Sequence, residues 1–256
     1  MRKNKSSRKI GLARALSKLG YCSRSRAAEL IRTGRVSLNG EIRRDSETPV
    51  SGTHSQIAVD GKLVQAQEKI YLMLNKPRGV LTTASDEKGH DTVYGILGNH
   101  AHSRMIPRWV APVGRLDKAS EGLLLLTNDS EWAARIAAPE THLDKTYHVQ
   151  VGTIADEQFI QALRRGVKTN DGEMLRAKQA LPLRAGQKNC WLEIVLDEGK
   201  NRHIRRMTEA LGVEVLRLVR VAIGPLQLGD LAKAQCRTLT TDEKRMLDRA
   251  LREKGS

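Results

Sequence analysis

The sequence is poor in the residues and motifs that build disulfide frameworks, zinc sites and nucleotide-cofactor sites. Its three cysteines, Cys22, Cys190 and Cys236, are odd in number and far apart, so we expect a reducing cytoplasm and no disulfide framework. No Cys-x-x-Cys or His-Glu-x-x-His spacing occurs, which predicts no structural or catalytic zinc. A dinucleotide-binding glycine fingerprint and a phosphate-binding P-loop are also missing, so we expect no cofactor.

The sequence also lacks an apolar run long enough for a membrane-spanning helix. Its first residues are polar and basic, so we expect no secretory signal. Acidic residues are outnumbered, because 29 Asp and Glu face 44 Lys and Arg, giving a net charge of +15. This excess indicates a polyanionic partner, with nucleic acid first and an anionic membrane surface as the alternative. A chain of 256 residues can form one large or two modest domains.

The N-terminal quarter is the most basic part, with 14 Lys and Arg against 5 Asp and Glu in residues 1–66. Residues 1–9 are polar and basic and predict a disordered arm. Leucine spacing predicts a helix over 10–19, and a serine, Ser23 or Ser25, can cap a second helix that ends near residue 33. Asn-Gly and Asp-Gly pairs predict two tight hairpins, over 36–42 and 57–63.

Four arginines lie at polar positions of this region, and only Glu29 lies close in sequence to neutralise them; they are Arg24, Arg26, Arg32 and Arg35. A solvated surface and a phosphate-binding surface both explain them, because an arginine fork binds phosphate at two points. The region has one aromatic residue, Tyr21, so we do not expect it to bind single strands by base stacking.

Residues 12–50 resemble the small RNA-binding domain named after ribosomal protein S-four. The segments that carry the resemblance are Ser-Arg-Ser-Arg-Ala-Ala-Glu-Leu-Ile and Gly-Arg-Val-Ser-Leu-Asn-Gly. The resemblance implies that folded RNA is recognised by shape and by phosphate contacts. We therefore expect an S-four-like domain over 10–66, a linker at about 65–69 and a second domain over 70–256.

The second domain contains a charged loop that leads into an apolar run, within residues 112–129. Leu123 to Leu126 form a short apolar run between Gly122 and Asn128, which predicts a buried strand. The loop before the run contains Asp117 between two cations. By chemistry alone, Asp117 could cap a turn and pair with a neighbouring cation, or it could be held at the rim of a cleft.

This loop and strand, Gly-Arg-Leu-Asp-x-x-Ser-x-Gly-Leu-Leu-Leu-Leu-Thr-Asn-Asp, resemble the catalytic motif of bacterial ribosomal-RNA pseudouridine synthases of the RsuA type. The resemblance implies that Asp117 is the essential catalytic residue. Lys-Thr-Tyr147 is similar to the family's Lys-x-Tyr, which implies that Tyr147 lies against the target base and removes a proton from it. Taken alone, Tyr147 is a core tyrosine on a half-buried strand over 145–151.

A third segment, from Gly199 to Met207, resembles the family pattern Gly-x-x-x-Gln-Ile/Val-Arg-Arg-Met. The resemblance implies that Arg205 forms an ion pair with Asp117 and keeps its carboxylate ionised. His203 stands where family members often have glutamine. The arginines at the start of this predicted helix are unfavourable for the helix dipole, which prefers acids there, and this suggests a functional role.

Further basic residues are expected to contact RNA. Arg115 is expected to fill the space left by a flipped base or to hold a neighbouring phosphate. The Lys-Pro turn at Lys76 resembles a turn of the family, which implies a role that is both structural and RNA-facing. The predicted RNA-binding residues are Arg24, Arg26, Arg32, Arg35, Lys76, Arg78, Arg115, Lys200, Arg202 and Arg206.

Runs of strands without a regular β-α-β rhythm predict an α+β fold, with a small N-terminal α/β RNA-binding domain and a catalytic domain built on a mainly antiparallel mixed sheet. The family fold is the same. The predicted function is isomerisation of one uridine of ribosomal RNA after the base is flipped out, with a slight preference for the large subunit from residues 198–212. The expected partner is ribosomal RNA or an assembly intermediate, and we expect a cytoplasmic monomer.

Other functions remain open at this stage. A non-catalytic RNA-binding assembly factor would keep the basic surface but would not need Asp117, Tyr147 and Arg205 together. An RNA N-glycosidase could use Asp117 and Glu121 as a carboxylate pair and would release free base. A methyltransferase would need a glycine-rich cofactor loop and a deaminase a pair of zinc-binding cysteines, and the sequence has neither.

Overall fold

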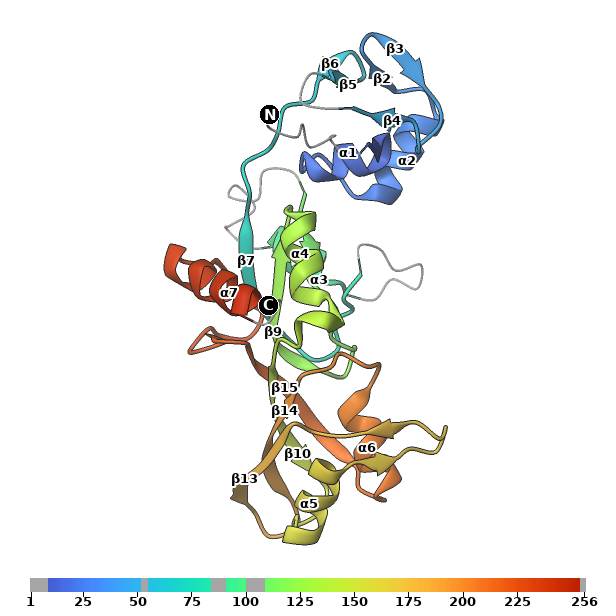
Figure 1. Ribbon diagram of the computed structural model, residues 1–256. Helices are drawn as coiled ribbons and strands as arrows, with labels where there is room; N and C mark the ends of the chain where they lie inside the picture. Colours follow the sequence, from blue (N-terminus) through green and yellow to red (C-terminus); the bar gives the residue numbers. More distant parts are fainter. Residues whose placement is uncertain (1–8, 52–54, 84–90, 100–108, 254–256) are drawn as a thin grey trace, which may run out of the picture. The chain divides into compact units, whose positions relative to one another are not determined.

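The computed structural model describes residues 9–51, 55–83, 91–99 and 109–253, and it divides into two compact units (Figure 1). The first unit comprises Met1–Tyr71, Arg104–Ala111 and Thr127–Trp132. The second unit comprises Leu72–Ser103, Pro112–Leu126 and Ala133–Ser256.

Two short helices and two small sheets form the N-terminal part of the first unit. Its elements are β1 (Ile10–Gly11), α1 (Leu12–Lys18), α2 (Arg24–Arg32), β2 (Val36–Leu38), β3 (Glu41–Arg43), β4 (Pro49–Val50), β5 (Ile57–Val59) and β6 (Lys62–Leu63). The strands β3, β2, β5 and β6 form a four-stranded sheet in that order, and β1 pairs with β4. The helices and the inward faces of the strands enclose one apolar core.

Local sequence signals account for much of this part. The Ser23 hydroxyl accepts a hydrogen bond from the Arg26 amide at 3.2 Å, so Ser23 caps α2 as predicted. Both hairpins form, and Asn39 and Asp60 each adopt a positive φ, as a tight turn of this kind requires. The first helix begins at Leu12 and not at residue 10, because Ile10 and Gly11 pair with β4 instead.

The remaining elements begin at Tyr71. They are β7 (Tyr71–Lys76), α3 (Val93–Asn99), β8 (Ala111–Pro112), β9 (Glu121–Thr127), α4 (Ser130–Ala137), the 3₁₀ helix η2 (Pro139–Thr141), β10 (Lys145–Val151), α5 (Glu157–Arg165), β11 (Val167–Lys168), β12 (Met174–Leu175), β13 (Gln179–Ala185), β14 (Cys190–Leu196), α6 (His203–Ala210), β15 (Val215–Ile223), β16 (Leu226–Gln227), β17 (Cys236–Thr238) and α7 (Thr241–Glu253).

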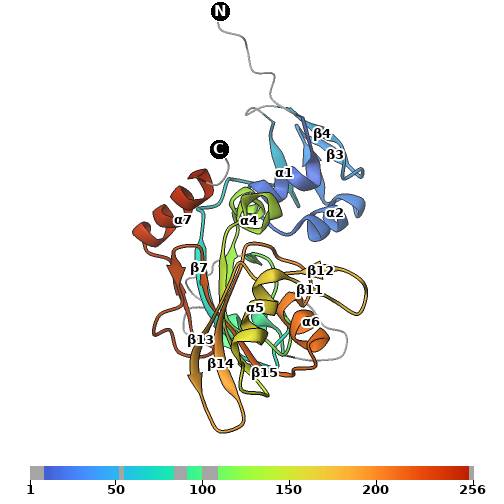
Figure 2. The ribbon, with the colours of Figure 1, turned by 60° about the horizontal axis from the view of Figure 1, so that its bottom comes forward.

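A long mixed sheet organises the second unit, with the strand order β13-β14-β10-β15-β9-β7-β17. The pairing of β15 with β9 is parallel, whereas the other strand pairs on this path whose register is described are antiparallel. Helices α5 and α6 lie on one face of the sheet in both views (Figures 1 and 2). Their apolar side chains pack with those of β10, β14 and β15 into the main core. The prediction of a mainly antiparallel mixed sheet is confirmed.

The predicted apolar run is a strand as expected, and all seven residues of β9 are buried. The capping box before α7 also forms, because Glu243 accepts from the Thr240 amide at 2.8 Å and Thr240 accepts from the Glu243 amide at 3.2 Å. Helical spacing in the sequence predicts that Met246, Leu247, Ala250 and Leu251 face inward from this helix. Leu247 and Leu251 are buried, but Met246 is 44% exposed, so the prediction is wrong for Met246. From the sequence, Ser130 is a candidate cap for α4, but the side chain that caps this helix is Asp129, which accepts from the Trp132 amide at 3.2 Å.

Two further predicted elements are shorter than expected. The stretch from Met174 to Ala180 is strand-like in sequence and predicts one strand, but in the structure it is divided into β12 and the start of β13. The helix predicted to open near Glu198 begins at His203, because Arg202 adopts a left-handed backbone conformation with φ 48°. The polar sequence over 83–108 predicts an exposed loop with a short helix near 93–97. Part of this segment lies outside the described residues, and α3 lies where the short helix is predicted.

Among the described residues, no helix combines the length and apolarity needed to cross a membrane. In the same part of the chain, no three His, Cys, Asp or Glu side chains are grouped so that they could hold a metal ion. The three cysteines are free and buried.

Candidate active site

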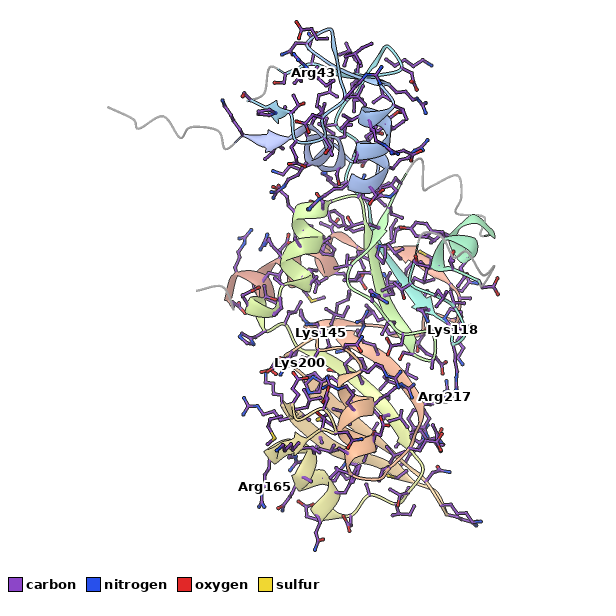
Figure 3. All side chains as sticks on the ribbon, turned by 90° about the vertical axis from the view of Figure 1, so that its right-hand side faces the viewer. Arg43, Lys118, Lys145, Arg165, Lys200 and Arg217 are labelled. Carbon is purple, nitrogen blue, oxygen red and sulfur yellow. The ribbon has the colours of Figure 1, made fainter. Side chains whose placement is uncertain are left out.

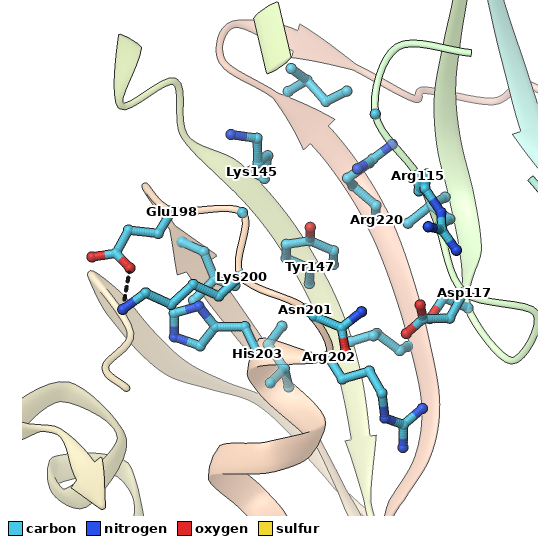
Figure 4. Close-up of a pocket in the computed structure, with 18 of the residues that line it drawn as sticks. Arg115, Asp117, Lys145, Tyr147, Glu198, Lys200, Asn201, Arg202, His203 and Arg220 are labelled. Atoms are coloured by element: carbon cyan, nitrogen blue, oxygen red, sulfur yellow. Dashed lines mark ion pairs between the residues drawn. The ribbon is translucent and has the colours of Figure 1, made fainter. Parts of the chain in front are cut away.

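A pocket of about 340 Å³ opens in the second unit, where several strand ends and two loops meet (Figure 4). The loop before β9 contributes Asp117, and β10 contributes Tyr147. The loop before α6 contributes Lys200 and Arg202, and β15 contributes Arg220. Ligand pockets are typically about 300–1,000 Å³, so this one has the size for a single nucleoside.

The side chain of Asp117 is half-buried in this pocket. Among the described residues, no cation lies within ion-pairing distance of its carboxylate, including its sequence neighbours Arg115 and Lys118, which are both exposed. The simple explanation in which Asp117 pairs with a neighbouring cation therefore does not describe this loop. Asp117 instead presents a carboxylate at the wall of a pocket.

The backbone around Asp117 is held by a complete set of hydrogen bonds. Main-chain and hydroxyl groups bind three of its carbonyls: the Thr82 hydroxyl donates to Leu116 at 2.7 Å, the Ser120 amide to Asp117 at 3.0 Å and the Gly79 amide to Lys118 at 2.7 Å. Two cationic side chains supply the other hydrogen bonds. Lys76 donates to the carbonyls of Asp117 and Ser120, and Arg205 donates to that of Ala119. Every carbonyl from Leu116 to Ser120 thus has a partner, which fixes the position from which the Asp117 side chain projects.

Lys76, at the end of β7, supplies two of these bonds. Its ammonium group donates to the carbonyls of Ser120 at 2.9 Å and Asp117 at 3.2 Å, and also to that of Pro77. The side chain is fully buried, and burial lowers the pKa of Lys76 to about 8. The expected structural role agrees with these contacts. The expected RNA-facing role is wrong, because a side chain with no exposed surface offers nothing to a nucleic acid.

Arg205, in α6, also holds this loop. Its guanidinium group donates to the carbonyl of Ala119 at 3.1 Å and to that of Val215 at 3.2 Å. Burial lowers the pKa of Arg205, with the neighbouring charge of Arg202 acting in the same direction and that of Asp117 opposing it. Arg205 is therefore close enough for its charge to interact with Asp117, but among the described residues the expected ion pair is not formed.

Tyr147 is both a tyrosine of the apolar core and a residue of the pocket wall. Its ring packs against the main apolar core, and the same residue lines the pocket. In the sheet it is the register partner of Arg220 on β15 and of Ile194 on β14. Figure 4 shows the Tyr147 ring between the loop that carries Lys200 and the loop that carries Asp117. A planar base entering the pocket would meet this ring.

Three of the remaining predicted RNA-binding residues of the second unit lie at the pocket. Arg115, Lys200 and Arg202 line it and are exposed, although Lys200 also pairs with Glu198 at 2.8 Å. Figure 3 shows Lys145, another pocket residue, near Lys200.

Two predicted RNA-binding residues have protein partners elsewhere. Arg206 turns away into ion pairs with Asp171 and Glu173. Arg78 is exposed and donates to the Leu216 carbonyl at 3.3 Å. The ion pairs leave the guanidinium of Arg206 less available to RNA than sequence alone suggested.

In the first unit, the four predicted arginines are all exposed, but their neighbours differ. Arg35 makes a two-point ion pair with Asp60, and Arg26 pairs with Glu29 at 2.7 Å. For Arg24 and Arg32 the described residues supply no ion pair. Of the four predicted arginines, Arg24 and Arg32 are therefore the two whose charges are not matched by an ion pair among the described residues.

Sequence reasoning missed Arg220, which is a buried cation in the pocket wall. It also missed that Glu121 faces away from the pocket. Glu121 is 3% exposed and pairs with Arg217 and Lys233 at 2.9 Å each, so it does not form a carboxylate pair with Asp117. His203 is buried, and its Nε2 donates to the Arg176 carbonyl at 3.1 Å. Burial lowers the pKa of His203, which favours the neutral imidazole.

Most of the chain is similar to known proteins. A family model described as RNA pseudouridylate synthase matches residues 70–210, and an S4 domain model matches residues 10–55. The chain is 37% identical over 245 residues to "Ribosomal large subunit pseudouridine synthase B" of Bacillus subtilis (strain 168), covering 95% of this chain and 97% of the relative.

Two further matches agree with these. The chain is 37% identical over 243 residues to an "Uncharacterized RNA pseudouridine synthase" of Aquifex aeolicus (strain VF5), covering 94% of this chain and 95% of the relative. A solved structure titled "Crystal structure of pseudouridylate synthase" superposes with a TM-score of 0.63 at 28% identity, covering 93% of this chain and 99% of that one.

Proposed function

The chain belongs to the RNA pseudouridylate synthase family, and we propose that it converts a specific uridine of ribosomal RNA, with preference for the large subunit, into pseudouridine. The names of similar proteins from Bacillus subtilis and Yersinia pestis, both "Ribosomal large subunit pseudouridine synthase B", support the choice of RNA and of subunit. The N-terminal S4 domain supports a folded RNA partner. The reaction is an isomerisation, in which no group is transferred to a second molecule and no net oxidation or reduction occurs.

The size and depth of the pocket support base flipping. A carboxylate in a pocket of about 340 Å³ cannot reach a uridine stacked within an RNA helix. The target nucleotide must leave the stack, at a cost of roughly a few kcal/mol. The exposed cations Arg115 and Arg202 at the pocket are suited to hold the phosphates beside the flipped nucleotide.

Asp117 then promotes cleavage of the bond between ribose C1′ and base N1. The uracil turns within the pocket and is rejoined to C1′ through its C5. We assign the C5 proton that this step releases to Tyr147, and its place in the pocket wall supports this role. Arg205 acts on Asp117 through the backbone of the loop and through its nearby positive charge.

The observation that carries this proposal is the contrast within one loop. All carbonyls from Leu116 to Ser120 are bound, yet the Asp117 carboxylate has no ion pair among the described residues and faces the pocket. A turn-capping or surface Asp would not need such support. A group that must meet one atom of a substrate does, because a misplacement of about 1 Å can cost roughly 100-fold in rate.

Product analysis tests the proposal. Ribosomal RNA made without modification is incubated with the wild type or with Asp117→Asn, digested to nucleosides and separated by chromatography. We expect pseudouridine from the wild type and none from Asp117→Asn, with equal RNA binding by both.

Two outcomes would overturn it. Free uracil in place of pseudouridine would indicate a glycosidase. Unchanged uridine, together with tight, salt-sensitive binding to free RNA and to partly assembled particles, would indicate a non-catalytic assembly factor.

A further inference from the structure

Arg220 is a buried cation that the reaction outlined above does not use. Its side chain is 5% exposed, yet it contributes to the wall of the pocket. Its Nε donates to the Leu123 carbonyl at 2.8 Å. Its Nη2 is buried and, within the described part of the chain, has no hydrogen-bond partner; no carboxylate there pairs with the guanidinium.

Such an arrangement is unfavourable for the protein alone. A buried charge is normally paired, and a buried donor is normally bonded, because each loses its interaction with water. Three atoms without partners belong to residues that line the pocket: Ser120 Oγ, His203 Nδ1 and Arg220 Nη2. Of these three residues, arginine is the permanently charged one. A ligand that brings an oxygen to Nη2 would relieve this cost.

The position of Arg220 is fixed by the fold. Its register partner across the parallel pairing of β15 with β9 is Gly122, which has a φ of +102°. A Cβ atom at Gly122 would lie 2.2 Å from the carbonyl oxygen of Arg220, so only glycine permits this approach. On its other edge, β15 changes register with β10 between Thr146 and Tyr147, beside the partner of Arg220. The sheet therefore places Arg220 between the Asp117 loop and Tyr147.

The other cations of the pocket are less suited to a base. Arg115, Lys200 and Arg202 are exposed, where they can follow phosphates that remain outside, and Lys145 is only half-buried. Arg220 is buried, so only the part of a nucleotide that enters the pocket can reach it. In Figure 4 its guanidinium group is directed toward the loop that carries Arg115, on the side toward which the Tyr147 hydroxyl points.

We propose that Arg220 donates a hydrogen bond from Nη2 to a carbonyl oxygen of the flipped uracil and stabilises the negative charge that forms on the ring. This inference rests on the proposed function. When C1′–N1 breaks, the bonding electrons remain on N1 and spread to O2 and O4. On the sugar, either C1′ forms a bond to a carboxylate oxygen of Asp117, which breaks again when C5 bonds to C1′, or the C2′ proton moves to Asp117 and leaves a C1′=C2′ double bond, and that proton returns to C2′ when C5 bonds to C1′. The C5 proton then leaves, and N1 gains a proton. Arg220 stays protonated throughout.

The first test compares single-turnover rates, with enzyme in excess over RNA, for wild type, Arg220→Gln and Arg220→Lys. Loss of a donor that stabilises charge in a transition state typically lowers the rate by about 10²–10³-fold. We expect a loss of that size for Arg220→Gln and a smaller one for Arg220→Lys, with RNA affinity and melting temperature near those of the wild type. Arg165→Gln, which removes an exposed charge on α5 (Figure 3), is the matched control.

The second test separates charge stabilisation from a structural role. RNA that carries 5-fluorouridine at the target has an electron-withdrawing fluorine, so its ring leaves more readily as an anion. The rate ratio between wild type and Arg220→Gln should therefore be smaller with 5-fluorouridine than with uridine, measured as loss of the target nucleoside after digestion. A purely structural role would lower both rates by the same factor.

Each result has one meaning. Equal ratios for the two substrates, or an Arg220→Gln rate close to that of Arg165→Gln, would overturn the role of Arg220 and leave the proposed function intact, provided the wild type is active. If Arg220→Gln does not fold, Arg220→Lys takes its place in the comparison. Failure of both to fold would make Arg220 a structural residue and overturn the inference. An inactive wild type would overturn the proposed function itself.

Discussion

Basic side chains have different surroundings in the two units. In the first unit, Arg24 and Arg32 are exposed, and the described residues offer them no ion pair. In the second unit, Lys76 and Arg220 are buried and Arg205 is half-buried, and all three donate to backbone carbonyls near the Asp117 loop or at the start of β9. The side chains of both groups are cationic, but the exposed ones can contact RNA phosphates and the buried ones contact backbone carbonyls.

This difference predicts which measurement each group controls. An exposed arginine can release counterions from RNA, so it contributes to affinity and to the salt dependence of affinity. A buried cation cannot reach phosphate. It contributes to the reaction rate, by holding the Asp117 loop in place or, as proposed for Arg220, by contacting the base inside the pocket. The two groups should therefore separate into variants with altered RNA affinity and variants with altered rate at saturating RNA.

Among the variants that should change both stability and rate, the largest effect is expected for Lys76→Met, which removes the charge and keeps the length of the side chain. The carbonyls of Pro77 and Ser120 lose the side-chain donor that binds them, which costs about 1–3 kcal/mol in the free energy of unfolding for each one left unsatisfied. The loop should shift, and the single-turnover rate should fall by roughly 10–100-fold. RNA affinity should remain near that of the wild type. Denaturant unfolding, rate and binding measurements check the three expectations.

The matched control is Lys188→Met, which removes an exposed lysine from the turn between β13 and β14. It should change none of the three quantities by much. If Lys76→Met weakened RNA binding while its rate at saturating RNA stayed at the wild-type level, the division between exposed and buried cations would be wrong.

A pH series provides an intermediate effect. Burial lowers the pKa of Lys76 to about 8, whereas the ordinary value is 10.5. Between these values the unfolded chain holds the proton and the folded chain does not, so the free energy of unfolding should rise with pH across this window, by about 3 kcal/mol. Activity should fall over the same range, because the neutral amine loses the charge that holds the Asp117 and Ser120 carbonyls.

The contribution of Lys76 is isolated by comparing wild type with Lys76→Met at each pH, since other groups titrate in both proteins. The difference in unfolding free energy should increase from pH 8 to pH 10.5. A difference that stays constant, or activity that rises together with stability, would contradict the assignment.

The smallest effect is expected for the exposed arginines. The double variant Arg24→Gln/Arg32→Gln should weaken RNA binding and reduce the slope of log affinity against log salt by about 0.7–0.9 for each phosphate that the variant no longer neutralises. Its rate at saturating RNA should not change. Arg35→Gln is the matched comparison, because Arg35 is already paired with Asp60 and its replacement should lower the slope less. Equal slopes for the double variant and the wild type would remove these arginines from the RNA surface.

Short-range features were predictable from sequence. The Ser23 cap, the two hairpin turns and the Thr240–Glu243 capping box each depend on residues within four positions of one another. The buried strand β9 follows from its run of four leucines. The candidate site was predictable through its resemblance to a family, which named Asp117, Tyr147 and Arg205, and the structure brings all three to the same region of the second unit.

Long-range features were not predictable, because they depend on pairings between distant segments. Arg220 is placed by a parallel pairing with Gly122. The buried ammonium group of Lys76 donates hydrogen bonds to carbonyls that lie about 40 positions later in the chain. Arg206 appeared free to bind RNA because its partners, Asp171 and Glu173, lie more than 30 residues before it. No local pattern distinguishes a lysine that binds phosphate from one that binds a backbone loop.

The most direct test of the central claim is tritium release from RNA labelled at uracil C5, offered separately as large-subunit and small-subunit ribosomal RNA. The account predicts release by the wild type from large-subunit RNA, limited to one tritium per molecule, and no release by Asp117→Asn although the variant folds and binds the same RNA. Release by Asp117→Asn at the wild-type rate would show that the pocket around Asp117 is not where the uridine is isomerised.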